Sequence, residues 1–156
     1  MAVTLASKRM GARRTMVPKR NSPAPRILLV EDDDDTRDLM QEGMEDAGLP
    51  VTAVADGEQA LTWATTHRPA LIVLDMRLPG IDGEEVARRL RAAFGAALPI
   101  LVVTAAADPQ GCTERAGGMI FLRKPFIMSE LTTAVRAILY ASSTGVPVFG
   151  RSSQGD

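Results

Sequence analysis

Five apolar runs recur along the chain, and more polar stretches separate them. The runs lie at 26–30, 51–55, 70–75, 99–105 and 119–124. Runs that are continuously apolar, without alternation, are typical of strands buried on both faces of a parallel sheet. We therefore predict five strands at these positions.

The stretches between the runs place apolar residues at helical spacing, three and four positions apart. They predict helices over 35–48, 56–67, 82–94 and 129–141. In the first of these helices we expect Leu39, Met40 and Met44 to face the sheet. Strands that alternate with helices predict an α/β fold, a doubly wound parallel sheet with helices on both faces.

The stretch 106–118, between the last two strands, fits a helix poorly. It contains Pro109, Gly111, Gly117 and Gly118, and glycine and proline are the least favourable residues inside a helix. We expect the fourth helix to be short or poorly formed.

Polar residues stand where the predicted helices begin, and we expect them to satisfy free backbone N–H groups there. These residues are Asp34 and Asp35, Asp56, Asp82 with Glu85 at capping-box spacing, and Ser129.

Five reactive side chains stand at the carboxyl ends of four predicted strands. Glu31 and Asp32 follow the first strand, and Asp75 ends the third. Thr104 ends the fourth strand and Lys124 ends the fifth. The ligand site of a doubly wound sheet lies outside the carboxyl ends of its strands, so these groups should converge at one edge.

This set of groups suits phosphoryl transfer. Mg²⁺ prefers oxygen ligands and binds through one or two carboxylates. An aspartate can form an aspartyl phosphate, while a metal, a lysine and a hydroxyl stabilise charge on the phosphoryl oxygens. The chain has no G-x-x-x-x-G-K-[ST] loop and no G-x-G-x-x-G motif, so nothing indicates a bound nucleotide.

Four motifs together resemble the receiver domain of two-component response regulators. They are ILLVED at 27–32, LIVLDMRLPGIDG at 71–83, ILVVTA at 100–105 and FLRKPF at 121–126. The resemblance covers residues 26 to about 140, and four motifs in this order are highly specific. It implies a flavodoxin-like (βα)5 fold with strand order 2-1-3-4-5.

The resemblance also implies a role for each acidic residue of the pocket. Asp75 looks like the phosphoacceptor, which takes a phosphoryl group from a histidine kinase, and it would also contact Mg²⁺. Asp32 looks like the main direct Mg²⁺ ligand, with Glu31 helping through water. The backbone carbonyl of Arg77 would be a further metal ligand, while its side chain should lie on the solvated rim.

The remaining site residues follow from the same resemblance. Thr104 looks like the switch hydroxyl that moves toward the phosphoryl group, and Phe121 like the aromatic residue that turns inward with it. Lys124 would pair with the phosphoryl oxygens, and its peptide bond to Pro125 is expected to be cis. The small side chain of Ala105 would leave room for the phosphoryl group.

The run of five acids that starts at Glu31 then divides into two parts. Its first two residues belong to the metal site. Asp33 is a candidate to assist by hydrogen bonds, toward Lys124, and Asp34 and Asp35 begin the helix.

The spacing departs from the family pattern in one place. Between Thr104 and Lys124 the chain has slightly fewer residues than receivers usually show. Our hypothesis is that the chemistry is kept while the output face, formed by the fourth helix, fifth strand and fifth helix, is altered.

Charge is distributed unevenly along the chain. Residues 1–26 carry seven basic residues and no acid, whereas residues 27–140 carry 18 acids against 10 bases. We expect 1–25 to be a basic disordered extension, 26–141 the receiver domain, and 142–156 a flexible tail. Alternatives for the extension are contact with nucleic acid, a transit peptide and a start codon placed too early.

The resemblance implies a cytoplasmic response regulator of a two-component system. Residues 141–156 are too few and too rich in Ser and Gly to fold alone, so we expect a stand-alone receiver. Phosphorylation by a histidine kinase or phosphotransfer protein would switch its binding to a downstream protein target. We expect no enzyme activity beyond its own phosphoryl transfer and autodephosphorylation, and a monomer or weak homodimer. No apolar run approaches the about 18 residues of a membrane span, so no membrane partner is expected.

Two other classes of function stay open. A receiver-like binding scaffold that is never phosphorylated would usually have a broken acid pocket. A haloacid-dehalogenase-like phosphotransferase or phosphatase would carry its nucleophile after the first strand, whereas Asp75 follows the third.

Three residues that invite a chemical role have plainer interpretations. We expect Trp63 to be packing, His67 to favour the negative end of a helix dipole, and Cys112 to be an inert helix cysteine.

Overall fold

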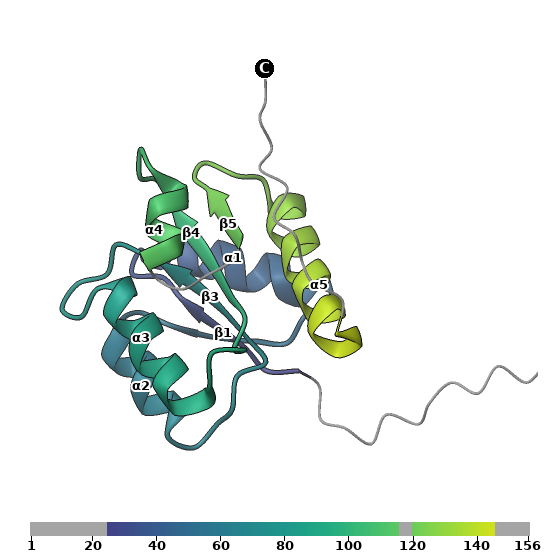
Figure 1. The fold of residues 1–156 in the computed structure, drawn as a ribbon. Coiled ribbons are helices and arrows are strands. Elements are labelled where there is room, and N and C mark those ends of the chain that lie inside the picture. The colour runs from purple at the N-terminus through teal and green to yellow at the C-terminus, as the bar shows by residue number, and fades with distance from the viewer. Residues whose placement is uncertain (1–24, 116–119, 146–156) are drawn as a thin grey trace, which may run out of the picture.

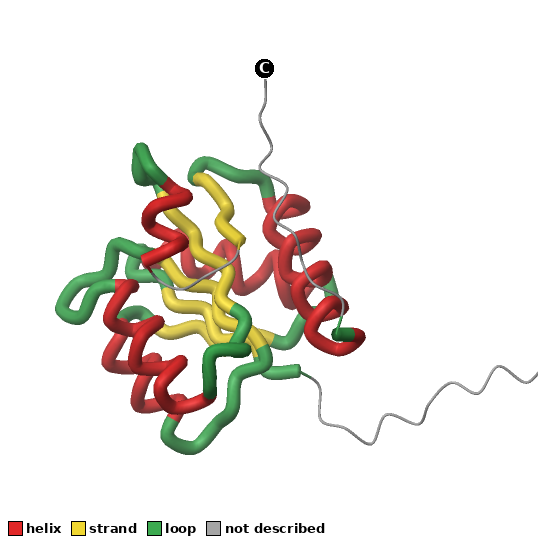
Figure 2. The backbone as a smooth tube through the Cα atoms, viewed as in Figure 1, coloured by secondary structure: helices red, strands yellow, loops and turns green. Residues whose placement is uncertain are grey.

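The structure, a computed structural model, describes residues 25–115 and 120–145, which form a parallel sheet between layers of helices (Figure 1, Figure 2). The strands are β1 (Ile27–Val30), β2 (Val51–Val54), β3 (Leu71–Asp75), β4 (Ile100–Thr104) and β5 (Ile120–Arg123). The helices are α1 (Asp34–Asp46), α2 (Gly57–Ala64), α3 (Gly83–Phe94), α4 (Pro109–Arg115) and α5 (Met128–Thr144). The strand order is β2-β1-β3-β4-β5 and every pairing is parallel. The predicted fold class and strand order are confirmed.

Some predictions fall outside the described part of the chain. They concern the extension before residue 25, most of the tail, and the glycines at 117 and 118. No helix of the described ranges is both long and apolar enough to cross a membrane.

Both faces of the sheet are covered, which explains the continuously apolar strands. Successive residues of a strand point to opposite faces. In β1, Ile27 and Leu29 join the core under α1 and α5, whereas Leu28 and Val30 join the core under α2 and α3. Figure 1 shows α2 and α3 together on one side of the sheet, with α5 on the other side.

The central strands set the position of the acidic residues. β1 pairs with β3 so that Val30 lies beside Leu74. Glu31 follows Val30 in the chain, and Asp75 follows Leu74. Because both strands run in the same direction, the two carboxylates reach the same edge of the sheet.

The start of α1 differs from the prediction. Its N-cap is Asp33, whose backbone is extended and whose carboxylate accepts the N–H of Thr36 at 2.8 Å. Asp34 and Asp35 begin the helix and lie in its first turn, as predicted, but the cap predicted for them is made by Asp33. Their carboxylates still lie near the positive end of the helix dipole.

The inward prediction for Leu39 is wrong, because its side chain is 63% exposed while Met40 and Met44 are buried. Neighbouring residues of a helix are turned by about 100° from each other. Leu39 therefore lies outside the stripe that the two methionines form against the sheet.

The starts of α2 and α3 agree with the prediction in part. Asp56 and Asp82 are their N-caps. The reciprocal half of the capping box in α3 is not made, because the Glu85 carboxylate binds the guanidinium groups of Arg88 and Arg89 instead. These hydrogen bonds lower the pKa of Glu85 to about 2.

The bounds of α5 and α2 also differ from the prediction. Ser129 is not a cap, because α5 starts earlier, with Ile127 as N-cap and the Glu130 carboxylate accepting the Ile127 N–H at 2.9 Å. The helix continues to Thr144, beyond its predicted end. α2 ends at Ala64, before the predicted end at 67, and the His67 ring stacks on Trp63 beyond it.

Within the part of the chain that the structure describes, the fourth helix is short, as predicted. α4 has seven residues, or about two turns, and it lies against β4 and β5. The Asp108 carboxylate accepts the N–H of Gly111 at 2.9 Å near its start. Cys112, on this helix, is partly buried and has a free thiol.

Candidate functional site

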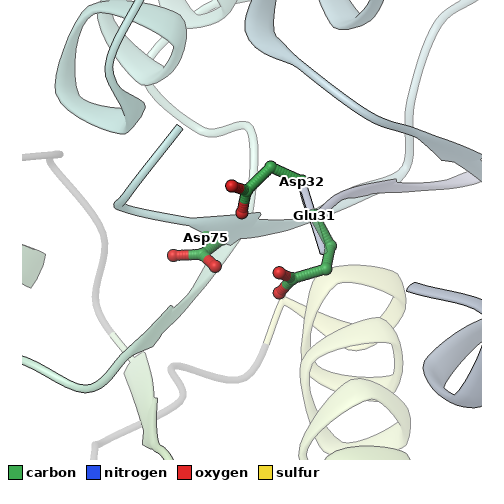
Figure 3. A group of neighbouring side chains, drawn as sticks. All are labelled: Glu31, Asp32 and Asp75. Atoms are coloured by element: carbon green, nitrogen blue, oxygen red, sulfur yellow. The ribbon is translucent and has the colours of Figure 1, made fainter. Parts of the chain in front are cut away.

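Three carboxylates from two strands meet at the carboxyl edge of the sheet. Glu31 and Asp32 follow β1, Asp75 ends β3, and their side chains gather in one place (Figure 3). One carboxylate oxygen of each residue lies within 4.8 Å of those of the other two. Glu31 is 1% exposed and Asp75 is 6% exposed, while Asp32 is exposed to solvent. The pocket therefore has a buried floor and one acid that faces outward.

Lys124, at the carboxyl end of the outermost strand β5, binds two of these acids. Its Nζ donates to Glu31 Oε2 at 2.9 Å and to Asp75 Oδ2 at 2.8 Å. The residue directly follows β5, two strands away from Asp75. Burial opposes the charge of Lys124, but its hydrogen bonds to Asp75 and Glu31 prevail and raise its pKa.

Glu31 has the most perturbed acid group of the pocket. Burial raises its pKa to about 6, because a charged carboxylate loses its hydration there. The hydrogen bond from Lys124 lowers the pKa and the nearby charge of Asp75 raises it. A nearby cation would favour the charged form of this group.

The second oxygen of Asp75 is held by the backbone. Oδ1 accepts the N–H of Arg77 at 2.8 Å, while Oδ2 pairs with Lys124. Both oxygens thus have fixed donors, so the carboxylate is held in one orientation.

Gly83, the first residue of α3, approaches the same loop closely. A Cβ at this position would lie 2.7 Å from Met76 Cα and 2.8 Å from the carbonyl oxygen of Asp75. Both are backbone atoms, so any larger residue would push the loop that carries Asp75. The absence of a side chain at Gly83 therefore helps to place the acid.

Thr104 and the residues around it lie where the sequence predicts. Thr104 is buried at the end of β4, and its Oγ1 accepts the N–H of Ala106 at 3.0 Å. The backbone N–H of Lys124 donates to the carbonyl oxygen of Thr104 at 2.9 Å. The Lys124–Pro125 peptide bond is cis, the isomer that the resemblance implies.

Phe121 and Ala105 lie near this strand end. Phe121 on β5 pairs with Val102 of β4 and is half-buried against the core under α2 and α3. Ala105 follows Thr104 and is exposed. The structure therefore places an aromatic residue beside the strand that carries the candidate switch hydroxyl.

Asp33 assists the pocket by a hydrogen bond, as suggested, because its backbone N–H donates to Glu31 Oε1 at 3.3 Å, but the suggested direction toward Lys124 is wrong. The Asp33 carboxylate caps α1 at Thr36 N–H, and the hydrogen bonds of Lys124 go to Glu31 and Asp75. Asp33 belongs to the helix start, because its extended backbone turns its carboxylate toward the first free N–H groups.

Arg37 also contacts the backbone of the acidic pocket, a role that the sequence did not predict. Its Nη1 donates to the carbonyl oxygens of Glu31 at 3.0 Å and Asp32 at 3.4 Å, and its Nη2 binds the Asp34 carboxylate. The available signal was the spacing of Asp34 and Arg37, three positions apart on a helix. That spacing predicts the ion pair but not the two contacts to backbone carbonyls.

The pocket fits a divalent cation by its charge and its donor atoms. Three carboxylates and one ammonium leave two negative charges in excess when all are ionised. Their oxygen atoms are hard ligands of the kind that Mg²⁺ prefers. Glu31, Asp32 and Asp75 could hold such an ion, and a role for the Arg77 carbonyl stays a prediction.

The chain is similar to proteins of one family. The family model described as response regulator receiver domain matches residues 27–136. The chain is 37% identical over 118 residues to the transcriptional regulatory protein PrrA of Mycobacterium tuberculosis, covering 74% of this chain and 50% of PrrA. It is 37% identical over 124 residues to the alkaline phosphatase synthesis transcriptional regulatory protein PhoP of Bacillus subtilis, covering 78% of this chain and 51% of PhoP. The chain thus spans about half the length of the curated relatives it matches.

Solved structures show the same likeness. A response regulator from Chloroflexus aurantiacus is 34% identical with a TM-score of 0.69, covering 76% of this chain and 99% of that chain. The response regulator protein TrrA of Thermotoga maritima, solved in complex with Mg(2+)-BeF, is 28% identical with a TM-score of 0.66. That match covers 73% of this chain and 98% of TrrA.

Proposed function

The chain belongs to the family of response regulator receiver domains, and we propose that it is switched by phosphorylation of Asp75. The phosphoryl donor is the phosphohistidine of a histidine kinase or of a histidine phosphotransfer protein. The observation that carries this proposal is the position of Asp75, buried at the end of β3 with Glu31, Asp32 and Lys124 around it.

In the proposed reaction an oxygen of the Asp75 carboxylate attacks phosphorus. A P–O bond to Asp75 forms as the P–N bond to the donor histidine breaks, and the imidazole leaves. The ammonium of Lys124 already binds Asp75 at 2.8 Å, so a small shift brings it to a phosphoryl oxygen. There it offsets negative charge that develops during transfer.

Mg²⁺ is the proposed cofactor, held by Asp32, Asp75 and, through water, Glu31. It would supply positive charge that stabilises the phosphoryl oxygens. The structure of the relative TrrA in complex with Mg(2+)-BeF supports this proposal. The excess of negative charge in the pocket of this chain supports it independently.

The conformational response is proposed to involve Thr104 and Phe121. The Thr104 hydroxyl, which accepts the Ala106 N–H, would turn to donate to a phosphoryl oxygen. Phe121, half-buried on the neighbouring strand, would turn inward into the space that this movement leaves.

The output is proposed to be binding to a downstream protein, not catalysis on a separate substrate. α4 is short, so we propose that the face formed by α4, β5 and α5 differs from that of receivers with a longer helix. We propose a cytoplasmic location, since the phosphodonor domains of histidine kinases act there.

Intact-mass measurement with a small phosphodonor tests the proposed function. Wild type, Asp75→Asn and the control Asp56→Asn are incubated with phosphoramidate and Mg²⁺. We expect one acid-labile phosphoryl adduct on wild type and on Asp56→Asn, which changes only the cap of α2, and none on Asp75→Asn. No adduct on wild type would favour a binding scaffold that is never phosphorylated, and an undiminished adduct on Asp75→Asn would exclude Asp75 as the acceptor.

A further inference from the structure

We propose that Arg37 is a positioning residue for the metal-binding acids, and this inference rests on the proposed Mg²⁺ site. Its guanidinium reaches back from the first turns of α1 to the chain that leaves β1. Nη1 donates to the carbonyl oxygens of Glu31 at 3.0 Å and Asp32 at 3.4 Å. Nη2 binds the Asp34 carboxylate. The side chain is only 17% exposed, so the group is held within the turn.

Asp32 is the acid that most needs such support. Glu31 is fixed by Lys124, and Asp75 is fixed by Lys124 and by the N–H of Arg77. Within residues 25–115 and 120–145, the carboxylate of Asp32 has no hydrogen bond and faces solvent. The position of this carboxylate therefore depends on its own backbone.

The backbone around Asp32 is held at four points, one of which is the bond from the Asp33 N–H to Glu31 Oε1 at 3.3 Å. Before it, the N–H of Glu31 donates to the carbonyl oxygen of Val54 at 3.2 Å. After it, Asp33 caps α1. Between these points, Arg37 holds the carbonyl of Asp32 itself and the carbonyl that precedes it. Without Arg37, the carbonyl oxygens on both sides of the Asp32 Cα would lose their side-chain donor, while the Asp33 N–H would keep its bond to Glu31 Oε1 at 3.3 Å.

Arg37 carries a positive charge near the pocket. The direction in which the affinity for Mg²⁺ changes when Arg37 is removed therefore tests the proposal. A guanidinium repels a divalent cation, so an Arg37 that acted by charge alone would weaken Mg²⁺ binding. Its removal would then tighten binding. An Arg37 that positions Asp32 has the opposite effect, because a ligand that is held in place binds the metal better than one that must be ordered first.

Two substitutions separate the charge of Arg37 from its geometry. Arg37→Met keeps most of the apolar stem and removes the charge and all donors. Arg37→Lys keeps the charge but lacks the planar fork that reaches two carbonyls and a carboxylate at once. The matched control is Arg136→Met, because Arg136 Nη2 donates to the carbonyl oxygen of Ala47, at the far end of α1, at 2.6 Å.

Calorimetric titration of the full chain with MgCl₂, at constant ionic strength, gives the first readout. We expect Kd for Mg²⁺ to rise about tenfold in Arg37→Met, the low end for residues that support a ligand. Arg37→Lys should also bind more weakly than wild type, and Arg136→Met should bind like wild type. Unchanged or tighter binding by Arg37→Met would overturn the inference, as would full affinity in Arg37→Lys.

Amide hydrogen exchange in EDTA gives a second readout that needs no metal. Exchange at Asp32 and Asp33 should be faster in both Arg37 variants than in wild type, with the later turns of α1 unchanged. Faster exchange along all of α1, or failure of both variants to fold, would assign Arg37 to helix stability and overturn its positioning role. A wild type that binds no Mg²⁺ would instead show that the proposed metal site is wrong.

Discussion

The acidic pocket and the segment between β4 and β5 belong to the same sheet but are built in different ways. In the pocket, groups from β1, β3 and the end of β5 are joined by Lys124, with distances of 2.8 and 2.9 Å to two buried carboxylates. In the segment between β4 and β5, α4 has seven residues, and its ion pair to α3, Arg115 with Glu84, lies between partly exposed side chains.

The difference follows from where each region obtains its rigidity. Glu31, Asp75 and Thr104 stand at the ends of strands in which every residue is buried, whereas Lys124 follows the partly buried β5. α4 instead contains Pro109 and Gly111, and Thr113 is the one buried residue among its seven. We infer that the chemistry is fixed by the sheet, whereas the α4 surface can vary with little cost to that chemistry.

The largest expected effect is the loss of Lys124. In Lys124→Met, two buried carboxylates lose their shared cation, and breaking a buried ion pair costs about 3 kcal/mol of the free energy of unfolding. Urea denaturation at pH 7 without Mg²⁺ measures this loss. The control is Arg88→Met, which breaks an exposed pair with Glu85 and should leave the midpoint unchanged. Similar midpoints for wild type and Lys124→Met would mean that the pocket is not held by this residue.

The next effect concerns the loop of Asp75. Gly83→Ala places a Cβ against backbone atoms at 2.7 and 2.8 Å, so we expect phosphorylation to slow by about 10- to 100-fold while the fold is kept. Gly43→Ala is the matched control, because the three atoms nearest to its Cβ would all belong to the flexible side chain of Met128. The initial rate of adduct formation is measured by mass, and a wild-type rate in Gly83→Ala would contradict the close approach.

The pH dependence of stability tests the burial of Glu31. Its folded-state pKa of about 6 exceeds the ordinary value of 4.5, so the folded state binds the proton more tightly than the unfolded state. Without metal, stability should therefore fall as the pH rises from 4.5 to 6. The fall should be at most about 2 kcal/mol. Glu31→Gln should remove this fall, since it cannot ionise.

Urea denaturation of both proteins in EDTA, across this pH range, checks the sign. Carboxylates with a lowered pKa, such as Glu85 with a pKa of about 2, change the stability at lower pH. Their contribution is the same in both proteins and cancels in the difference between them. A difference that grows in favour of wild type as the pH rises would contradict the burial of Glu31.

The smallest expected effect lies at α4. Glu84→Gln removes the ion pair between α3 and α4. In this pair Arg115 Nε donates to Glu84 Oε1 at 2.6 Å, and both side chains are partly exposed. Exposed ion pairs contribute little to stability. We expect no measurable change in the unfolding midpoint or in the rate of phosphorylation. A slower phosphorylation of Glu84→Gln would show that α4 and the pocket are coupled, against the comparison drawn above.

The sequence was informative where a residue's role depends on its place in a strand. Asp75 and Thr104 end continuously apolar runs, Lys124 follows an apolar run and Arg123, and parallel strands bring such ends to one edge. The short α4 was predictable from local backbone preference, because proline and glycine, here Pro109 and Gly111, are unfavourable inside a helix.

Other features depend on contacts that periodicity does not encode. Leu39 is exposed because it is turned by about 100° around the helix axis from its buried neighbour Met40. The apolar type of both residues does not show which of them faces the sheet. Asp33 and Asp34 are equally good caps by residue type, and only the backbone angle of Asp33 decides between them. Arg37 reaches carbonyl oxygens five and six positions before it, and a backbone acceptor carries no signal in the sequence.

Asp75 is the proposed acceptor of the phosphoryl group, and chemical trapping of the adduct identifies the acceptor residue. Wild type is phosphorylated with Mg²⁺ and phosphoramidate, then reduced with borohydride, which converts an aspartyl phosphate to homoserine. Peptide sequencing by mass spectrometry locates the converted residue. We predict homoserine at position 75 and at no other aspartate. Homoserine at Asp32 or another acid, or none in a protein that carries the adduct, would contradict the account.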